Sequence, residues 1–373
     1  MPDPFPPVHL PARGVPLRAG LWPAVALAAP SVAQRNVLLG LQAEAGALAG
    51  AVFAPTTRET YGRYQRYYVR FMCRSGLRPF VFDGVEAHLI LYVTSLTHTC
   101  KYATICCYLQ GVKQFFLDAG LQDPLRPDRT PPLAGFWRVM AGIERLHSGV
   151  VLRKQPVERW MLLRFQQQLQ LWGDLSTNTQ HLAVLTAMMV AWLGMYRISN
   201  IGVPSAATLP ADVHMMRRDD VSLDFVNYCL WTSTRWSKTN QEGKRVHKIA
   251  IPGLRGSPVD PVGLYCALSA RVPAVEGGQH AFSYIGGRGR VVSLTKAVFG
   301  DFTKRLATAI GLPSEGFSGR SFRRGGASDA FDKGVAGELI QRIGDWVSPV
   351  YRVYIDISPA QQLAASRRML ADA

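Results

Sequence analysis

Four short segments in the second half of the chain hold side chains that could bind or react with a phosphate group. A guanidinium binds phosphate oxygens through paired hydrogen bonds, an ammonium can give up a proton, and a tyrosine oxygen can act as a nucleophile. Each segment alone also has an ordinary structural explanation, such as a helix-end salt bridge or a solvated lysine at a hairpin tip. The segments contain Arg197 in residues 194–201, Lys238 in residues 237–243, Arg320 and Arg323 in residues 317–328, and Trp346, Tyr351 and Tyr354 in residues 344–355.

The overall charge predicts a polyanionic partner. The 373 residues include 42 Lys and Arg against 26 Asp and Glu, so the formal net charge is +16. A basic folded protein of this kind usually meets a polyanion, and the candidates are nucleic acid, an anionic membrane surface or no specific partner. The longest largely apolar run, residues 182–195, has 14 residues. A membrane span needs about 20, so this run predicts a buried core helix.

Cysteine usage and the proline-rich start bear on the compartment. The six cysteines show no CxxC spacing and two are adjacent, which is typical of reduced core thiols rather than a disulfide framework or a zinc site. Residues 21–29 faintly resemble a signal peptide, but Pro23 interrupts them and the cysteines argue against export. We therefore expect an irregular leader over residues 1–52, with a short helix near 33–48, in a protein that is not secreted.

Hydrophobic periodicity predicts the elements that must position these residues. Thr56 and Thr57 offer an N-cap for the first strong helix. The glycine-rich stretch 277–289 lacks the spacing of a phosphate-binding loop and is predicted to be an ordinary loop. Helices are expected at residues 58–74, 85–97, 101–119, 133–147, 157–171, 178–195, 261–270, 294–310, 321–332 and 336–343, with short strands at 221–225, 228–234 and 244–251.

The first strong helix has a basic face beside an aromatic stripe. Two interpretations remain open: a solvated amphipathic helix, or a helix whose arginines contact phosphates while the aromatic residues pack inward. We add two lysines of the helix at 101–119 to the DNA-binding set. The basic residues are Arg63, Arg66, Arg70, Arg74, Lys101 and Lys113, and the stripe is Tyr61, Tyr64, Tyr68 and Phe71.

Taken together and in this order, the four segments resemble the tyrosine recombinase, or phage integrase, family. Residues 321–326 (SFRRGG) look like the family's His-Ser-Phe-Arg-Arg-Gly motif, and residues 344–355 look like its terminal Gly-x-Trp…Tyr-Ile motif. The amino-acid sequences of these motifs are similar to those of recombinases encoded by mobile elements. The resemblance implies two catalytic arginines, a hairpin lysine, an indole donor and a tyrosine nucleophile, which are Arg197, Arg323, Lys238, Trp346 and Tyr354, with Arg320 in the histidine position.

The resemblance also implies the architecture and partners. We expect a mainly α protein with a small antiparallel sheet. A helical core-binding domain is expected at residues 53–148, a linker at 149–156, and a mixed α/β catalytic domain at 157–373. The partner would be double-stranded DNA, bound by a homo-oligomer that forms a synaptic tetramer, with no metal, no cofactor and no membrane. The compartment would be the one that holds DNA: the nucleus in a eukaryote, the cytoplasm or nucleoid in a bacterium.

Three positions depart from the family pattern. Arg320 can donate to a phosphate but cannot shuttle a proton. Asn200 stands where the family usually has an acid that orients the first arginine, and Asp345 would place a carboxylate beside the phosphate. These departures favour, as an alternative, a degenerate recombinase that only binds DNA. A metal-dependent nuclease needs convergent carboxylates, which are scarce here. A type IB topoisomerase shares the Arg, Lys and Tyr chemistry, but the core-binding unit and the terminal motif resemble recombinases more.

Overall fold

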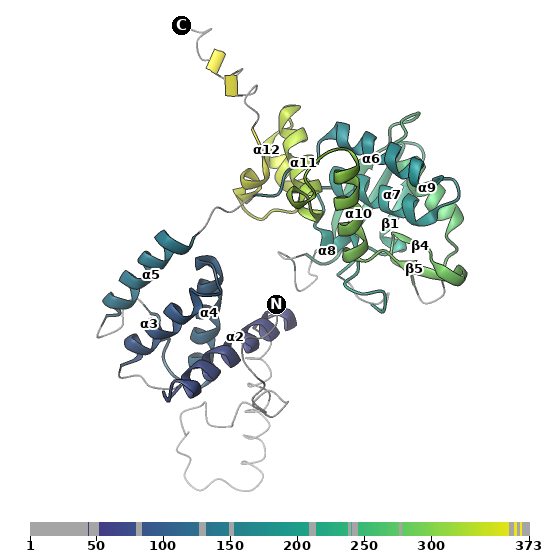
Figure 1. Ribbon diagram of the computed structural model, residues 1–373. Coiled ribbons are helices and arrows are strands. Elements are labelled where there is room, and N and C mark those ends of the chain that lie inside the picture. The colour runs from purple at the N-terminus through teal and green to yellow at the C-terminus, as the bar shows by residue number, and fades with distance from the viewer. Residues whose placement is uncertain are drawn as a thin grey trace. The chain divides into compact units, whose positions relative to one another are not determined.

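Helices dominate the computed structural model (Figure 1), which describes residues 44, 52–79, 84–126, 132–148, 153–208, 214–237, 240, 245–275, 278–357, 362–363 and 366–367. The chain divides into two compact units, Met1–Val151 and Leu152–Ala373. Nearly all of the predicted leader lies outside the described residues, including all but one residue of the helix predicted at 33–48. Lys238 lies outside them as well. No described helix is long and apolar enough to cross a membrane.

The first unit is a set of packed helices: α2 (Pro55–Arg74), α3 (Val85–Leu96), α4 (Tyr102–Asp118) and α5 (Ala134–His147). Tyr68, Phe116 and Phe136 are fully buried in its core. Helix α2 begins at Pro55, with Ala54 as its N-cap, so the predicted cap at Thr56 and Thr57 is wrong. Proline suits the first helical position because its missing N–H has no partner there in any case.

The second unit is built on the buried helix α7 (Thr179–Leu193). Its residues from Leu182 to Trp192 are at most 5% exposed, which confirms the predicted core helix. Asn178 caps it by accepting from the His181 N–H at 3.0 Å. The remaining helices are α6 (Arg159–Trp172), α8 (Ile198–Ile201), α9 (Pro261–Arg271), α10 (Lys296–Ala309), α11 (Gly319–Asp332) and α12 (Gly337–Ile343).

Two small antiparallel sheets lie among the described residues of this unit. One has the order β1 (Val221–Asp224), β2 (Cys229–Thr234) and β3 (His247–Pro252), with Thr232 paired to Val221 and Ile249, and confirms the predicted sheet. The other pairs β4 (Ser283–Ile285) with β5 (Val291–Ser293). Strand β4 lies inside the stretch predicted as a loop, so that prediction is wrong. Three residues are too few for a periodic signal to appear.

Two further expectations need correction. Residues 153–157 are extended and bonded to the second unit, with the Gln155 N–H donating to the Gly316 carbonyl at 2.7 Å and the Val157 N–H to the Ser321 carbonyl at 2.9 Å. The end of the predicted linker therefore packs on this unit. All six cysteines are free, but only Cys229 among them is buried, so most are not core thiols.

Helix α11 packs against its neighbours at backbone distance. A Cβ on Gly325 would lie 1.9 Å from the Val157 carbonyl oxygen, and one on Gly326 would lie 2.0 Å from the Trp192 carbonyl oxygen. Real Cβ atoms cannot approach so closely, because close-packed interiors hold no spare volume. The paired glycines of the SFRRGG segment thus let α11 approach α7 closely.

Gly326→Ala should destabilise the second unit by about 1–3 kcal/mol, the usual cost of overpacking. Denaturant unfolding of the full chain measures the change. Gly300→Ala is the matched control, because nothing lies within 4 Å of a Cβ added there in the middle of α10. It should be neutral or stabilise by up to about 1 kcal/mol. Unchanged stability of Gly326→Ala would contradict the packing described above.

Candidate active site

Arg323 is the buried centre of the candidate site. It projects from α11, whose first turn is fixed by a capping box in which Ser318 accepts from the Arg320 N–H at 3.3 Å and donates its N–H to Ser321 at 3.0 Å. Only 3% of Arg323 is exposed. Its Nη1 donates to the Met195 carbonyl at 2.5 Å. Its Nε and Nη2 have no hydrogen-bond partner among the described residues.

Two aromatic rings lie against the Arg323 guanidinium. Its Cζ lies 3.8 Å from the Trp346 ring centroid and 5.4 Å from that of Tyr354. Burial, together with the positive charge of Arg197, lowers the pKa of Arg323 to about 9, although Tyr354 and Asp345 oppose the shift. The charged form of Arg323 therefore lacks part of the stabilisation that a fully paired guanidinium receives.

Arg197 reaches the same pocket from the start of α8, and an acid lies beside it. Its Nη1 is 3.9 Å from Oδ2 of Asp345. The other oxygen of Asp345 accepts a hydrogen bond from Nη2 of Arg245, which stands two residues before β3. One buried carboxylate thus contacts arginines from two separate elements.

Asn200 plays a structural part that its position in the sequence does not reveal. Its amide donates to the Trp236 carbonyl at 3.0 Å and to the His214 carbonyl at 3.5 Å. A carboxylate could not make these contacts, because it has no proton to donate. Asn200 therefore ties α8 to the end of β2, and the acid that contacts Arg197 is Asp345.

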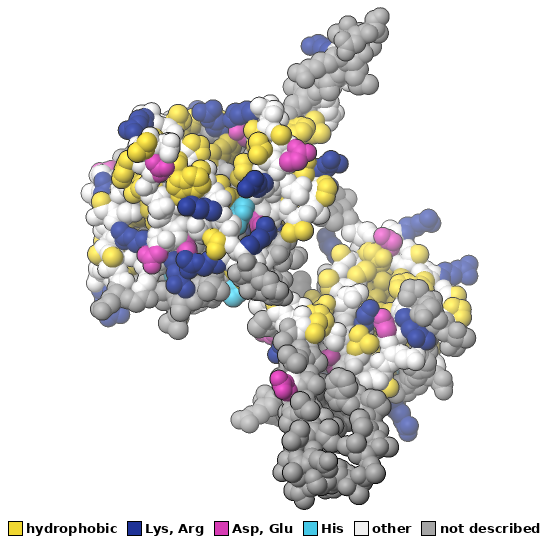
Figure 2. Space-filling view, turned by 180° about the vertical axis from the view of Figure 1, so that it is seen from behind, with side chains coloured by type: hydrophobic (Ala, Val, Ile, Leu, Met, Phe, Trp, Pro, Cys, Tyr) yellow, Lys and Arg dark blue, Asp and Glu magenta, His cyan; other side chains and the backbone are white. Residues whose placement is uncertain are grey.

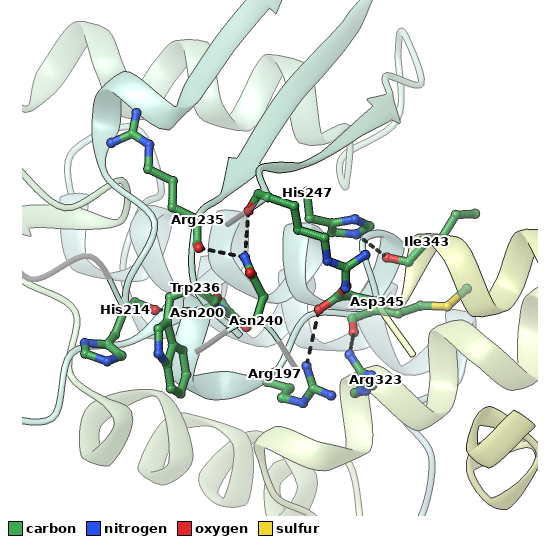
Figure 3. Close-up of polar contacts among 12 residues, drawn as sticks. Arg197, Asn200, His214, Arg235, Trp236, Asn240, His247, Arg323, Ile343 and Asp345 are labelled. Atoms are coloured by element: carbon green, nitrogen blue, oxygen red, sulfur yellow. Dashed lines mark hydrogen bonds and ion pairs between the residues drawn. The ribbon is translucent and has the colours of Figure 1, made fainter. Parts of the chain in front are cut away.

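Asn240 joins the two ends of the connection between β2 and β3. Its side-chain amide donates to the Arg235 carbonyl at 2.9 Å and to the Arg245 carbonyl at 2.6 Å (Figure 3). These bonds fix the backbone of Arg245 next to the pocket. Arg235 and Arg245 flank Lys238 in the sequence, and the placement of Lys238 itself is not described.

The terminal motif folds onto α11 and α12. A Cβ on Gly344 would lie 1.7 Å from the Trp346 ring, so only glycine fits beneath the indole. Nε1 of this buried indole has no hydrogen-bond partner among the described residues. Beyond it, Asp356 pairs with Arg324, and its N–H donates to Ser328 Oγ at 2.9 Å.

The two tyrosines of this motif differ in burial. They lie in a 3₁₀ helix, Pro349–Tyr354. The Trp346 ring centroid lies 5.2 Å from that of Tyr354 and 6.3 Å from that of Tyr351. Tyr351 is buried, and its hydroxyl is 2.2 Å from where a Cβ on Gly337 would stand. Tyr354 is half-buried beside Arg323.

The pocket brings together part of the predicted set. Arg197 and Arg323 line it, and Trp346 and Tyr354 stack behind Arg323. Arg320 is exposed on the first turn of α11 although it stands three residues before Arg323. Sequence reasoning missed Arg245 and His247. The Nε2–H of His247 donates to the Ile343 carbonyl at 3.1 Å. Their only signal was the basic run at residues 244–248.

The basic face predicted on α2 is largely open to solvent. Arg63, Arg66 and Arg74 are exposed, Arg70 is half-buried, and Tyr68 is buried as expected for the inward stripe. At α4, the N-cap residue Lys101 is exposed, but Lys113 pairs with Asp123 at 2.7 Å. Figure 2 shows Lys and Arg side chains spread over the visible face of both units, with fewer acidic ones among them.

Among the described residues, no group of three or more His, Cys, Asp or Glu side chains could hold a metal ion. No protein-family model matches the sequence, and neither does any curated protein. The fold, in contrast, is shared with solved structures.

A Tn1549 transposon integrase in complex with circular intermediate DNA is similar with a TM-score of 0.54 at 16% identity, over 86% of this chain and 95% of that one. The XerH site-specific recombinase bound to difH substrate gives 0.52 at 14% identity, over 91% and 85%. A lambda integrase dimer bound to a core site gives 0.52 at 15% identity, over 85% and 94%. These proteins are tyrosine recombinases, and the chain has their fold, as its motifs predicted.

Proposed function

We propose that this protein cleaves and rejoins DNA strands in site-specific recombination or integration, through a 3′-phosphotyrosyl intermediate and without a metal. One observation supports this most directly. The buried Arg323 guanidinium has two nitrogens without partners among the described residues, and it lies against Trp346 and Tyr354. A buried charge with unpaired N–H groups is costly unless a ligand supplies the missing acceptors. A phosphodiester offers the negative oxygens that are missing.

The proposed step uses the residues as follows. The Tyr354 hydroxyl releases its proton to solvent as its oxygen attacks phosphorus, and the bond to the 5′ oxygen breaks. Arg197 and Arg323 stabilise the charge that grows on the non-bridging oxygens, and the indole N–H of Trp346 is a neutral donor to the same group. Lys238 gives a proton to the leaving 5′ oxygen. Attack by that hydroxyl on the phosphotyrosine reverses the step and rejoins a strand.

A second candidate is a protein that only binds DNA. The observation that favours it is the Asp345 carboxylate in the pocket, together with an exposed Arg320. Recovering DNA from the denatured expressed protein and sequencing its ends separates the two functions. Covalently attached DNA supports strand cleavage. Binding alone is supported if the protein shifts labelled DNA in a native gel but no DNA stays attached to the protein after denaturation.

Tyr354→Phe should abolish the covalent adduct and leave DNA binding within about twofold, because only the attacking oxygen is removed. Tyr351→Phe is the matched control, since Tyr351 is buried and lies farther from Trp346 than Tyr354 does. It should still form the adduct. An adduct that survives Tyr354→Phe would assign the nucleophile elsewhere.

Lys238→Ala should slow cleavage by about 10²–10⁴, the usual contribution of a general acid. A duplex with sulfur in place of the 5′ bridging oxygen needs no such proton, because a thiolate leaves readily. On that duplex the variant should react nearly as fast as the unmutated protein. Equal defects on both duplexes would limit Lys238 to a role in binding.

DNA affinity should fall steeply with salt, because neutralising each phosphate releases counterions. Replacing both Arg63 and Arg66 with Ala should make the slope of log affinity against log salt shallower by about 2, at about 0.9 for each phosphate that the variant no longer neutralises. Lys333→Ala is the control, because this lysine lies outside the predicted DNA-binding set and pairs with Asp329. A slope unchanged by the double variant, as measured by gel shift or anisotropy, would leave the basic face of α2 as a solvated surface.

A further inference from the structure

The Asp345 carboxylate connects two arginines that the chain places 48 residues apart, Arg197 and Arg245. Asp345 is only 8% exposed. Its Oδ2 lies 3.9 Å from Nη1 of Arg197, and its Oδ1 accepts a hydrogen bond from Nη2 of Arg245. The two guanidiniums remain accessible, with 22% and 52% of their side chains exposed. Both can therefore contact a ligand while the carboxylate holds them.

The backbone at Asp345 is in a conformation that favours glycine. It follows the C-cap of α12 with φ at +53°, in the left-handed region. Its N–H donates to the Arg342 carbonyl at 3.2 Å, and the Trp346 N–H to the Gln341 carbonyl at 3.0 Å. Glycine or asparagine would close this turn more easily. The geometry of the turn therefore gives no reason for an aspartate at position 345. The contacts of its carboxylate with the two arginines do give one.

The side chains at the pocket carry more positive than negative charge, which favours the binding of an anion. Arg197 and Arg323 line it with Asp345, and Arg245 bonds to the same carboxylate. One carboxylate cannot balance three guanidiniums, and Nε and Nη2 of Arg323 have no partner among the described residues. Asn200, at the position where an acid was expected, donates to backbone carbonyls instead. Asp345 is thus the described acid in contact with Arg197.

We infer that Asp345 is a positioning residue that aims Arg197 and Arg245 at the scissile phosphate, and that Arg245 is a further phosphate-binding cation of this site. The inference deepens the proposed function and rests on it. The carboxylate restrains the two guanidiniums before DNA arrives, so less motion must be frozen out in the transition state. Its negative charge also reduces the repulsion among the arginines in the free protein.

The test uses single-turnover adduct formation on the duplex whose sequence is recovered from the covalent complex. Asp345→Asn removes the charge but keeps the size, and asparagine tolerates the left-handed backbone. At saturating DNA its rate should fall about 10- to 100-fold, the expected effect of misplacing groups by about 1 Å. The half-saturating DNA concentration should stay the same or fall, because a negative charge near the phosphate is gone. Arg245→Ala should show a similar loss of rate, and the double variant should be little worse than either single one.

A second duplex carries a neutral methylphosphonate at the scissile position. Its transition state develops less charge for the arginines to stabilise, so the Asp345→Asn defect should shrink to about threefold or less. Asp329→Asn is the charge-matched control. It breaks the exposed pair with Lys333 outside the pocket and should react like the unmutated protein.

Two results would overturn the inference while leaving the proposed function intact. If Asp345→Asn reacts as fast as or faster than the unmutated protein on the ordinary duplex, then the carboxylate only competes with DNA. If its defect is equal on both duplexes, then its role is structural. An unmutated protein that forms no adduct at all would sink the proposed function, and this inference with it.

Discussion

A guanidinium taken out of water costs several kcal/mol unless its N–H groups find partners, and Arg323 is buried with only part of that requirement met. The Met195 carbonyl accepts from one nitrogen, and Met195 itself has φ at +49°, a strained value for a residue with a side chain. The Trp346 ring covers the guanidinium face at 3.8 Å. The second unit thus holds a partly satisfied cation in a fixed place, which suits the binding of an anion.

The rest of the unit supplies the rigidity for this arrangement. Gly325 and Gly326 let α11 pack closely on the backbone of Val157 and Trp192. This packing fixes the position of Arg323 at the pocket. The terminal segment is attached to the same helix by the pair Arg324–Asp356. The helix that carries the arginine therefore also carries the segment with Tyr354. Strain at the site is balanced by dense packing around it, as expected where a fold is pre-organised for function.

The sequence predicts the long elements and the site residues that occur in local motifs. Helix α7 could be recognised because it is apolar on all sides, and α11 because its motif is contiguous. The short strands β4 and β5 could not be predicted, since three residues carry no periodic signal. The contact between Arg245 and Asp345 also escaped, because residues 100 positions apart meet only through the tertiary fold. Arg320 and Arg323 share a sequence motif, but only packing leaves one exposed and the other buried.

Asp345 shows why an unusual residue at a site is judged by its contacts. From the sequence alone, a carboxylate beside Trp346 opposes phosphate binding. In the structure its two oxygens face guanidiniums, and Asn200 is committed to the carbonyls of Trp236 and His214. The acid therefore offsets repulsion among arginines that lie close together. Its position in the chain matters less than where the fold places it, because only the fold brings its two oxygens to arginines from separate segments.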